Sequence, residues 1–572
     1  MPVAQRLAVA PFENLSYSSE LDWAGRAIAA GIVYDLTGAP NVYAQAVDSI
    51  QGAQSGGASR IVAGYLFQIN GRLEIRVAIE DGSRAKTVGS FGLSGPVSEG
   101  VLPLVNQLAR QLGPGARSFG TADSAAFRAY GEGLLAADPT AAARGFQSAT
   151  AADPHFAEAY MDWAKVLLAT GDRGQGATVL MAAKGSRPDG IDDAKIDYLL
   201  AAASGDPARR LTALEALTRR TPADPTKFKE LAELHLAQRR FPDAVRNYEA
   251  AARLSPAESG NWNELGYARA FAQDLAGARE ALEEYQRLTA PEDLNALDSL
   301  GEVSFHLGDF EAAGKYFLEA DRRSPGALGG AELLKAAQAR MMMGDLRGAD
   351  EIFQKFQKHA GLAAYQQAQW EFLTGRRKAG MALLEKLSAT TAGDVRAISL
   401  SQLSIWRLAT GDSKDAADLA GRAEAGAVST QVRNLGAMVQ SIAAGNAANA
   451  YALLFARKYR EAVPLLEAMY RGTNPLFDGQ IRTLLAWAYV ETGRIAEARA
   501  LLRIYPIPLS PGEPLFASLI FPRYFYLRGA VLQDEGKRAE AKQSYELYLK
   551  YAGDVPEVFG DEEKVRKFVG LR

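Results

Sequence analysis

The sequence predicts a mainly α-helical protein, a right-handed α-solenoid of about 12 helix pairs preceded by a small α/β domain. Of its 572 residues, 48% are hydrophobic and 23% are charged, as in a folded globular chain. Small and large apolar residues recur every 34 or 35 residues after about residue 121, which is typical of stacked helix pairs. Before residue 113 the hydrophobic pattern has a period of two instead, which indicates strands.

Alternation is clearest in residues 72–81, where Leu73, Ile75 and Val77 share one face of a predicted strand. Asn70 and Gly71 precede this strand and are typical of a tight two-residue hairpin turn. A Gly/Ser-rich turn is expected at residues 54–59. The predicted elements of this region are strands over 6–12, 42–43, 60–70, 72–81 and 86–93, and helices over 21–36 and 98–112.

The repeating part begins with helix pairs in which the same residue types return at fixed offsets. Small residues such as Gly266 and Gly301 let the two helices of a pair cross closely, and large residues such as Phe317 fill the space between pairs. One repeat contains Phe228, Leu231, Ala232, Ala244 and Tyr248; the next two contain Trp262, Leu265, Gly266, Ala278 and Leu282, then Leu297, Leu300, Gly301, Ala313 and Phe317. These residues resemble the tetratricopeptide repeat (TPR).

Turns within the pairs are marked by Gly-Asp dipeptides such as Gly308-Asp309 and Gly344-Asp345. The glycine is expected to end the first helix in a left-handed conformation. The predicted domains are therefore an α/β domain over 1–113, the helical array over 121–553, and a charged tail over 554–572 that caps the last pair. Residues 189–222 and 361–450 match the repeat pattern poorly, so the number of pairs there stays open.

The first domain also carries a resemblance. Leu-Ala-Val-Ala-Pro-Phe-Glu-Asn at residues 7–14, together with residues 63–65 and 71–77, is similar to the amino-terminal module of TolB-like and curli-assembly-like bacterial proteins. That resemblance implies a bacterial source and favours an envelope location. It brings no catalytic residues with it.

Charge and composition exclude several classes of function. The 64 basic residues are balanced by 67 acidic ones, whereas a nucleic-acid-binding protein usually has a basic excess. The chain has no cysteine, which removes disulfides, thiol nucleophiles and sulfur ligands for zinc. No apolar run is long enough to span a membrane, so no direct membrane span is expected. The location is predicted as periplasm or cell envelope if residue 1 is not the natural start, and as cytoplasm otherwise.

Catalytic motifs are also lacking in the sequence. The four histidines, at positions 155, 235, 306 and 359, are too far apart for a helical metal-binding pair. Neither a phosphate-binding loop nor a nucleophile elbow is present. We therefore expect no enzyme activity, no catalytic, cofactor-binding or metal residues, and no cofactor.

A binding surface is expected on the first helix of each pair, because the TPR resemblance implies that these helices line a concave groove. Tyr267, Phe271, Phe305 and His306 would place aromatic anchors on that groove. The alternative interpretation of each predicted groove residue is that it is simply exposed on the surface of a helix and binds nothing. The predicted partner-binding residues are Lys229, Glu233, Asn263, Tyr267, Phe271, Asp298, Glu302, Phe305 and His306.

The charges in this groove argue against one known mode of TPR binding. Chaperone-binding TPR domains hold the terminal carboxylate of a peptide with lysine and asparagine, as the resemblance implies. Here Lys229 is accompanied by Glu233, and Asp298 by Glu302. These acids would repel a carboxylate, so we predict that the chain is not a carboxylate clamp.

The function predicted from the sequence is a non-enzymatic bacterial protein–protein interaction scaffold that binds a protein or peptide on the concave face of the array. Two alternatives remain open. In the first, the chain is an envelope assembly factor. In the second, it is the regulatory or sensory portion of a signalling enzyme such as a kinase or cyclase. The partner and the oligomeric state are not predicted.

Overall fold

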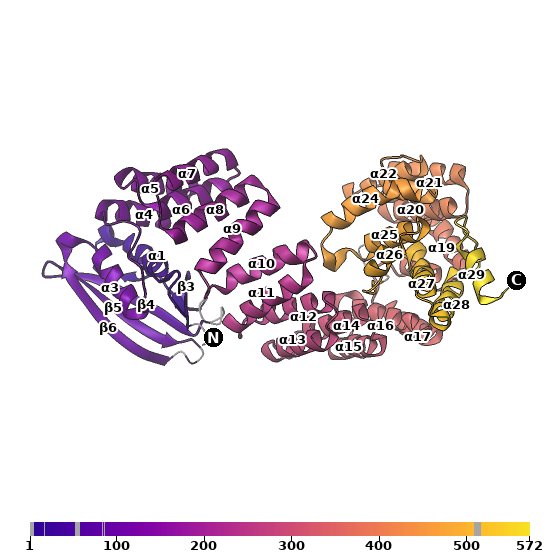
Figure 1. The fold of residues 1–572 in the computed structure, drawn as a ribbon, viewed down its shortest axis with the longest axis horizontal. Coiled ribbons are helices and arrows are strands. Elements are labelled where there is room, and N and C mark those ends of the chain that lie inside the picture. Colours follow the sequence, from indigo (N-terminus) through magenta and orange to yellow (C-terminus); the bar gives the residue numbers. More distant parts are fainter. Residues whose placement is uncertain are drawn as a thin grey trace. The chain divides into compact units, whose positions relative to one another are not determined.

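The computed structural model describes residues 5–16, 18–51, 58–82, 84, 86–507 and 516–571. The chain divides into two compact units (Figure 1). The first unit comprises Met1–Leu236 and Arg240–Leu265, and the second comprises Ala237–Arg239 and Gly266–Arg572. The expected turn at residues 54–59 lies mostly outside the described residues.

A sheet with strand order β3-β1-β4-β5-β6 forms the start of the first unit. The strands β3, β1 and β4 are parallel, and β4, β5 and β6 are antiparallel. Asn70 and Gly71 both have positive φ, 49° and 75°, as a two-residue hairpin turn requires, which confirms the predicted hairpin. The strands are β1 (Gln5–Val9), β2 (Glu13–Asn14, paired with β4), β3 (Val42–Ala46), β4 (Arg60–Ile69), β5 (Arg72–Asp81) and β6 (Lys86–Pro96).

Two helices, α1 (Ala24–Leu36) and α3 (Leu102–Leu112), join the same hydrophobic core as the sheet. Leu73, Ile75 and Val77 of β5 are buried in that core, so the alternation read from the sequence identifies the inward face correctly. The structure thus contains the small α/β region expected before the array. Its TolB-like type stays a prediction.

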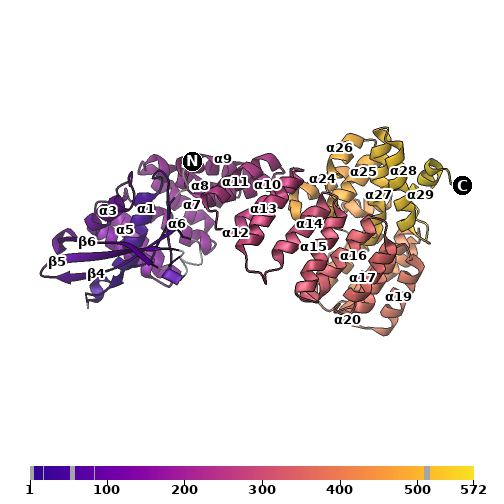
Figure 2. The same cartoon turned by 90° about the horizontal axis from the view of Figure 1, so that it is seen from below.

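Helices predominate among the described residues after α3, and most of them are paired as antiparallel hairpins. In Figure 2 the successive hairpins α14/α15 and α16/α17 lie side by side in the second unit. The helices are α4 (Ser124–Leu135), α5 (Pro139–Ala152), α6 (Ala157–Ala169), α7 (Arg173–Gly185), α8 (Gly190–Ser204), α9 (Pro207–Arg220), α10 (Pro225–Ala237), α11 (Phe241–Leu254), α12 (Ser259–Phe271), α13 (Leu275–Leu288), α14 (Asn295–His306), α15 (Phe310–Arg323), α16 (Ala331–Met342), α17 (Leu346–Phe356), α18 (Ala363–Leu373), α19 (Arg377–Thr390), α20 (Gly393–Ala409), α21 (Ser413–Gly426), α22 (Thr430–Ala443), α23 (Ala450–Phe455), α24 (Tyr459–Gly472), α25 (Gly479–Glu491), α26 (Ile495–Leu501), α27 (Ala517–Asp534), α28 (Arg538–Ala552) and α29 (Asp561–Val569).

Within the described residues, α4 to α28 make twelve hairpins if α22 is set aside as an extra helix. This number agrees with the roughly 12 pairs expected from the repeat length. The extra helix lies in residues 361–450, where the sequence matched the repeat poorly. Its presence shifts the phase of the repeat, which explains why a fixed period fails there.

The Gly-Asp turns have the predicted geometry. Gly308 and Gly344 have left-handed φ values of 86° and 77°, which a side chain would disfavour. The aspartate that follows caps the next helix: Asp309 accepts a hydrogen bond from the backbone N–H of Ala312 at 3.1 Å. The dipeptide therefore ends one helix and starts the next, which keeps the two helices of a hairpin in a fixed register.

The boundaries predicted at residues 113 and 121 separate two kinds of fold, but they do not separate two cores. Phe127 of α4 packs against Trp23 at 5.7 Å between ring centroids, and Gly131 leaves room for the same indole ring. Arg117, in the connection between the two parts, pairs with Asp189 at 2.5 Å and stacks on Tyr34. The division into domains over 1–113, 121–553 and 554–572 stays a prediction.

Two glycines of the second unit provide a test of the packing. A Cβ at Gly301 would lie 2.4 Å from the Phe317 ring, whereas one at Gly314 would meet only the Ala339 methyl group at 3.8 Å. Gly301→Ala is expected to lower the free energy of unfolding by about 1–3 kcal/mol because the ring must shift. Gly314→Ala should raise it by about 0.5–1 kcal/mol through helix propensity. Urea unfolding of both variants checks this, and destabilisation of equal size would contradict it.

Candidate functional site

The candidate site lies on α12, α14 and α16, which are the first helices of three consecutive hairpins. Five polar side chains meet there: Tyr267, Asp298, Glu302, Glu332 and Lys335, which we call the polar ladder. The Tyr267 hydroxyl donates a hydrogen bond to Glu302 Oε2 at 2.8 Å. Lys335 Nζ donates to Glu302 Oε1 at 2.9 Å and also to Asp298, and it lies 3.7 Å from Glu332. The ladder therefore joins neighbouring repeats through charge-assisted hydrogen bonds.

Water reaches part of the ladder, because the side chains of Asp298 and Glu302 are 24% and 25% exposed. Burial and the neighbouring carboxylates raise the pKa of Glu332 to about 7. Burial also raises the pKa of Asp298, with the charge of Glu302 adding to the effect. For Glu302 the burial effect is outweighed by Lys335, which holds its pKa below the usual value. Three carboxyl groups thus share one ammonium group, and the site has an acidic excess.

Two of the four predicted aromatic anchors, Phe271 and Phe305, are buried. Phe305 is completely buried and Phe271 is 5% exposed. The Phe305 ring packs against Phe310, which in turn contacts Tyr505. The expectation that these two phenylalanines present their rings to a partner is therefore wrong, because residues of the same unit cover them.

His306 is also engaged by the same covering segment. Its Nδ1 lies 2.8 Å from the carbonyl oxygen of Tyr505, and its own carbonyl accepts the Tyr505 backbone N–H at 2.9 Å. Burial lowers the pKa of His306 to about 4, so the ring is neutral at pH 7. Unlike the phenylalanines, His306 is only half-buried, and it lies at the edge of the ladder.

The other predicted binding residues are at least partly accessible. In the first unit, Lys229 and Asn263 are half-buried and Glu233 is exposed. Glu264 lies close enough to Lys229 and Glu233 to feel both charges, and burial raises its pKa. Acidic groups thus accompany Lys229, as the argument against a carboxylate clamp assumed. The binding roles of the seven residues other than Phe271 and Phe305 stay predictions.

Two members of the ladder, Glu332 and Lys335, were missed by the sequence reading. The spacing from Ala313 and Phe317 to Ala349 and Phe353 is 36 residues, not 34 or 35. A glycine-rich stretch before α16 accounts for the extra length. A search that allowed this spacing would have placed both residues on the first helix of the next pair.

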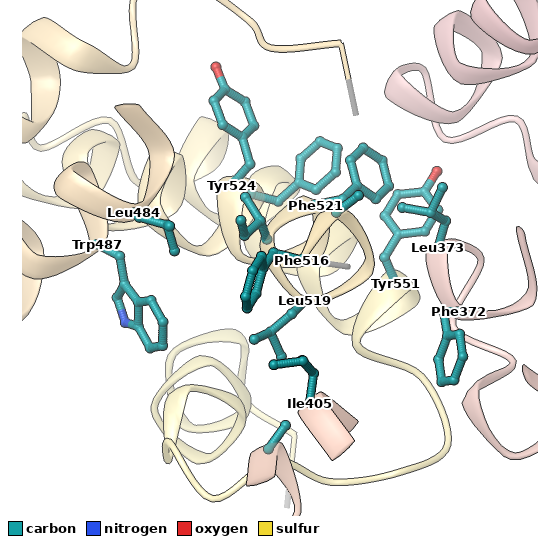
Figure 3. Packing of buried hydrophobic residues seen from close by; sticks show 14 of the residues in the cluster. Phe372, Leu373, Ile405, Leu484, Trp487, Phe516, Leu519, Phe521, Tyr524 and Tyr551 are labelled. Atoms are coloured by element: carbon teal, nitrogen blue, oxygen red, sulfur yellow. The ribbon is translucent and has the colours of Figure 1, made fainter. Parts of the chain in front are cut away.

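Farther along the array, the polar side chains on the first helices of the hairpins are uncharged amides. Gln369 of α18 donates to Gln402 of α20 at 3.0 Å, and both side chains are completely buried. Amides replace carboxylates because an ionised group without water is far more costly than a hydrogen-bonded amide. Figure 3 shows why water does not reach these side chains: Leu373 lies beside Tyr551, and Ile405 lies beside Leu519. The helices α27 and α28 therefore fill this part of the inner space. The described residues of α18 and α20 therefore do not face an open groove at these positions.

Across the described residues, the structure has no group of three or more His, Asp or Glu side chains placed to hold a metal ion. None of the described helices has both the length and the apolar character needed to cross a bilayer.

The comparison with protein families identifies the class of the array. The family model of the tetratricopeptide repeat matches residues 229–293, 263–327 and 447–514. The chain therefore contains tetratricopeptide repeats, and its helical hairpins form the corresponding kind of solenoid. Such repeats are in general scaffolds for protein interactions. No curated protein sequence matches the chain.

Several solved structures share part of this architecture. A tetratricopeptide repeat protein from Parabacteroides merdae is 12% identical, covers 49% of this chain and 98% of its own, and has a TM-score of 0.32. MamA from Desulfovibrio magneticus is 19% identical over 30% of this chain and 97% of its own, with a TM-score of 0.26. YrrB, described as a TPR protein with an unusual peptide-binding site, is 14% identical over 33% and 97%, with a TM-score of 0.30. Nothing about function follows from likenesses this distant.

Proposed function

We propose that this chain is a non-enzymatic interaction scaffold that binds a cationic, extended segment of a partner protein at the polar ladder. The observation that carries the proposal is the acidic excess at a partly exposed surface on α14 and α16. Asp298 and Glu302 have about a quarter of their side-chain surface open to water and already bind one ammonium group, that of Lys335. A lysine or arginine of the partner would supply the missing positive charge.

Physical considerations support this choice of partner. Hydrogen bonds between ammonium or guanidinium groups and carboxylates are stronger than neutral ones and select for charge. Tyr267 and Lys335 hold the two carboxylates in place, so little side-chain entropy is lost when a ligand binds. An acidic peptide would instead face the charges of Asp298 and Glu302. The ladder therefore favours a basic ligand.

The non-enzymatic part of the proposal rests on His306, the one histidine at the edge of the ladder. A general base needs a pKa near the working pH. Burial lowers the pKa of His306 to about 4, so its ring is a weak base at pH 7, and its Nδ1 contact with the Tyr505 carbonyl group fastens two segments together. These properties suit a structural histidine better than a catalytic one.

Binding of a labelled peptide tests the proposal. The probe is a fluorescein-labelled eight-residue peptide of alternating lysine and alanine, added to the full chain and followed by anisotropy. The double variant Asp298→Asn/Glu302→Gln is expected to bind at least tenfold more weakly than the wild type, because the acidic excess is removed. The wild-type affinity should also fall as salt is added.

A matched control is Glu311→Gln, which removes one carboxylate from the exposed surface of α15. This variant should bind the lysine peptide as the wild type does, and a peptide of alternating glutamate and alanine should not bind. Equal affinity of the wild type and the double variant for the lysine peptide would refute the proposal.

A further inference from the structure

The segment between α28 and α29, residues 553–560, is held in the second unit in the way that a bound peptide is held. We call it the tail peptide. It is not helical, and it crosses the turns of three hairpins. The backbone N–H of Asp554 donates to the Gly375 carbonyl at 3.2 Å, and that of Val558 donates to Ala409 at 3.0 Å. Arg377 donates to the Val555 carbonyl at 2.8 Å.

Side chains at the end of this segment provide the specific contacts. Glu557 pairs with Arg377 at 2.6 Å and also with Arg523. Asp561, the first residue of α29, accepts hydrogen bonds from Nε and Nη2 of Arg523, each at 2.9 Å. Phe559 is 1% exposed, and its ring meets Trp487 edge-on at 5.0 Å. Two acids and one aromatic ring thus anchor the tail in the sequence Glu-x-Phe-x-Asp.

The receiving surface is held in place by residues that do not belong to the tail. The Arg377 guanidinium stacks on the Trp406 ring at 4.5 Å, and that of Arg523 stacks on Trp487 at 4.1 Å. Arg523 also donates to the carbonyl oxygen of Leu519 at 3.1 Å. Because these contacts are made by α19, α20, α25 and α27 alone, both arginines would keep their positions if the tail left. The surface is therefore preorganised for carboxylates.

The tail itself lies at the surface of the unit. Asp554 and Pro556 are exposed, and Val558 is 39% exposed. Gly411 permits its close approach, since a Cβ there would lie 3.0 Å from Val558. In the α23/α24 turn, Arg457 takes the left-handed position with φ of 59°, as Arg239 and Gln273 do in the turns of two earlier hairpins. Arg457 Nη1 donates to the Val558 carbonyl at 3.3 Å, which adds one more contact to the tail.

We propose that the surface formed by Arg377, Arg457, Trp487 and Arg523 is a recognition site for an extended acidic peptide, Glu-x-Phe-x-Asp, of a partner protein. The tail peptide is its built-in occupant, and a partner segment of the same chemistry replaces it. Buried ion pairs are a poor way to maximise stability, because apolar residues of similar volume often serve as well. They are well suited to selecting one ligand by charge. This site is separate from the polar ladder, which takes a cationic partner.

The test uses the full chain and a labelled synthetic peptide with the sequence of residues 553–569. In the wild type the attached tail competes at millimolar effective concentration, so the free peptide binds weakly. The release variant Glu557→Gln/Asp561→Asn weakens that competition. It is expected to bind the peptide at least tenfold more tightly than the wild type. A control peptide with glutamine and alanine at the positions of Glu557 and Phe559 should not bind.

Two results would overturn the proposal. The first is a release variant that unfolds cooperatively and has native circular dichroism, yet binds the peptide no better than the wild type. If the release variant does not fold, hydrogen exchange of the wild type decides instead. The backbone amides of the tail are expected to exchange at least tenfold faster than those of α27. Protection of the tail amides equal to that of α27 is the second overturning result, because it would show that the tail is a permanent part of the core.

Discussion

Replacing Arg523 by leucine is expected to lower the free energy of unfolding of the second unit by about 3–5 kcal/mol. The guanidinium group is 2% exposed and pairs with Glu557 and with Asp561, which is itself 1% exposed. Without it, Asp561 loses its counter-charge in a place that water barely reaches. Burial already raises the pKa of Asp561 even with Arg523 present, so the unpaired carboxylate would be costly to ionise.

Urea unfolding followed by tryptophan fluorescence measures this effect, because Arg523 stacks on Trp487. The control is Arg566→Leu, which removes an exposed arginine paired with Glu562 on α29 and should change stability by less than about 1 kcal/mol. Adding Asp561→Asn to Arg523→Leu should recover part of the loss. A loss below about 1 kcal/mol in the single variant would contradict the account of the buried charges.

The variant Asp35→Asn is expected to remove a pH dependence from the stability of the first unit. Asp35 of α1 is completely buried, and neither of its carboxylate oxygens has a hydrogen-bond partner among the described residues. Burial raises its pKa from 3.8 to about 7, and the charges of Arg117 and Arg110 offset this only in part. Because the folded pKa lies above the unfolded one, the stabilisation is complete below about pH 4 and is lost as the pH rises through 7.

The shift corresponds to a loss of up to about 4 kcal/mol between pH 4 and pH 8. Asparagine cannot ionise, so the variant should gain stability relative to the wild type as the pH rises. Denaturant unfolding of both proteins at pH 5, 6, 7 and 8 measures the difference, and other titrating groups cancel in the comparison. Glu132→Gln, at an exposed site on α4, should follow the wild type. Parallel curves for Asp35→Asn and the wild type would show that Asp35 titrates normally.

The parts of the fold that depend on neighbouring residues could be predicted from the sequence. Asn70 and Gly71 determine their hairpin because few other residues accept positive φ at both turn positions. Gly308 and Asp309 act on the two helices they join, so their effect is also local. For the same reason the number of hairpins follows from the repeat length.

The candidate site was harder to predict because it depends on contacts between distant residues. Phe305 has the spacing of a groove residue, yet it packs against Phe310, which in turn contacts Tyr505, and Tyr505 lies 200 positions after Phe305 in the chain. Lys335 was missed because the spacing of that repeat differs by one or two residues. A period in the sequence identifies which helix a residue belongs to, but it does not tell what packs on that helix.

The change from carboxylates to amides along the inner helices has a consequence for how the second unit responds to its surroundings. Dissolved ions weaken attraction between charges that they can approach, and they leave neutral, enclosed amides such as Gln369 and Gln402 unaffected. Added electrolyte would thus weaken the contacts of Asp298 and Glu302 with Lys335 and leave the hydrogen bond between Gln369 and Gln402 unchanged. The helices α14 and α16 would then respond to salt at this surface, whereas α18 and α20 would not.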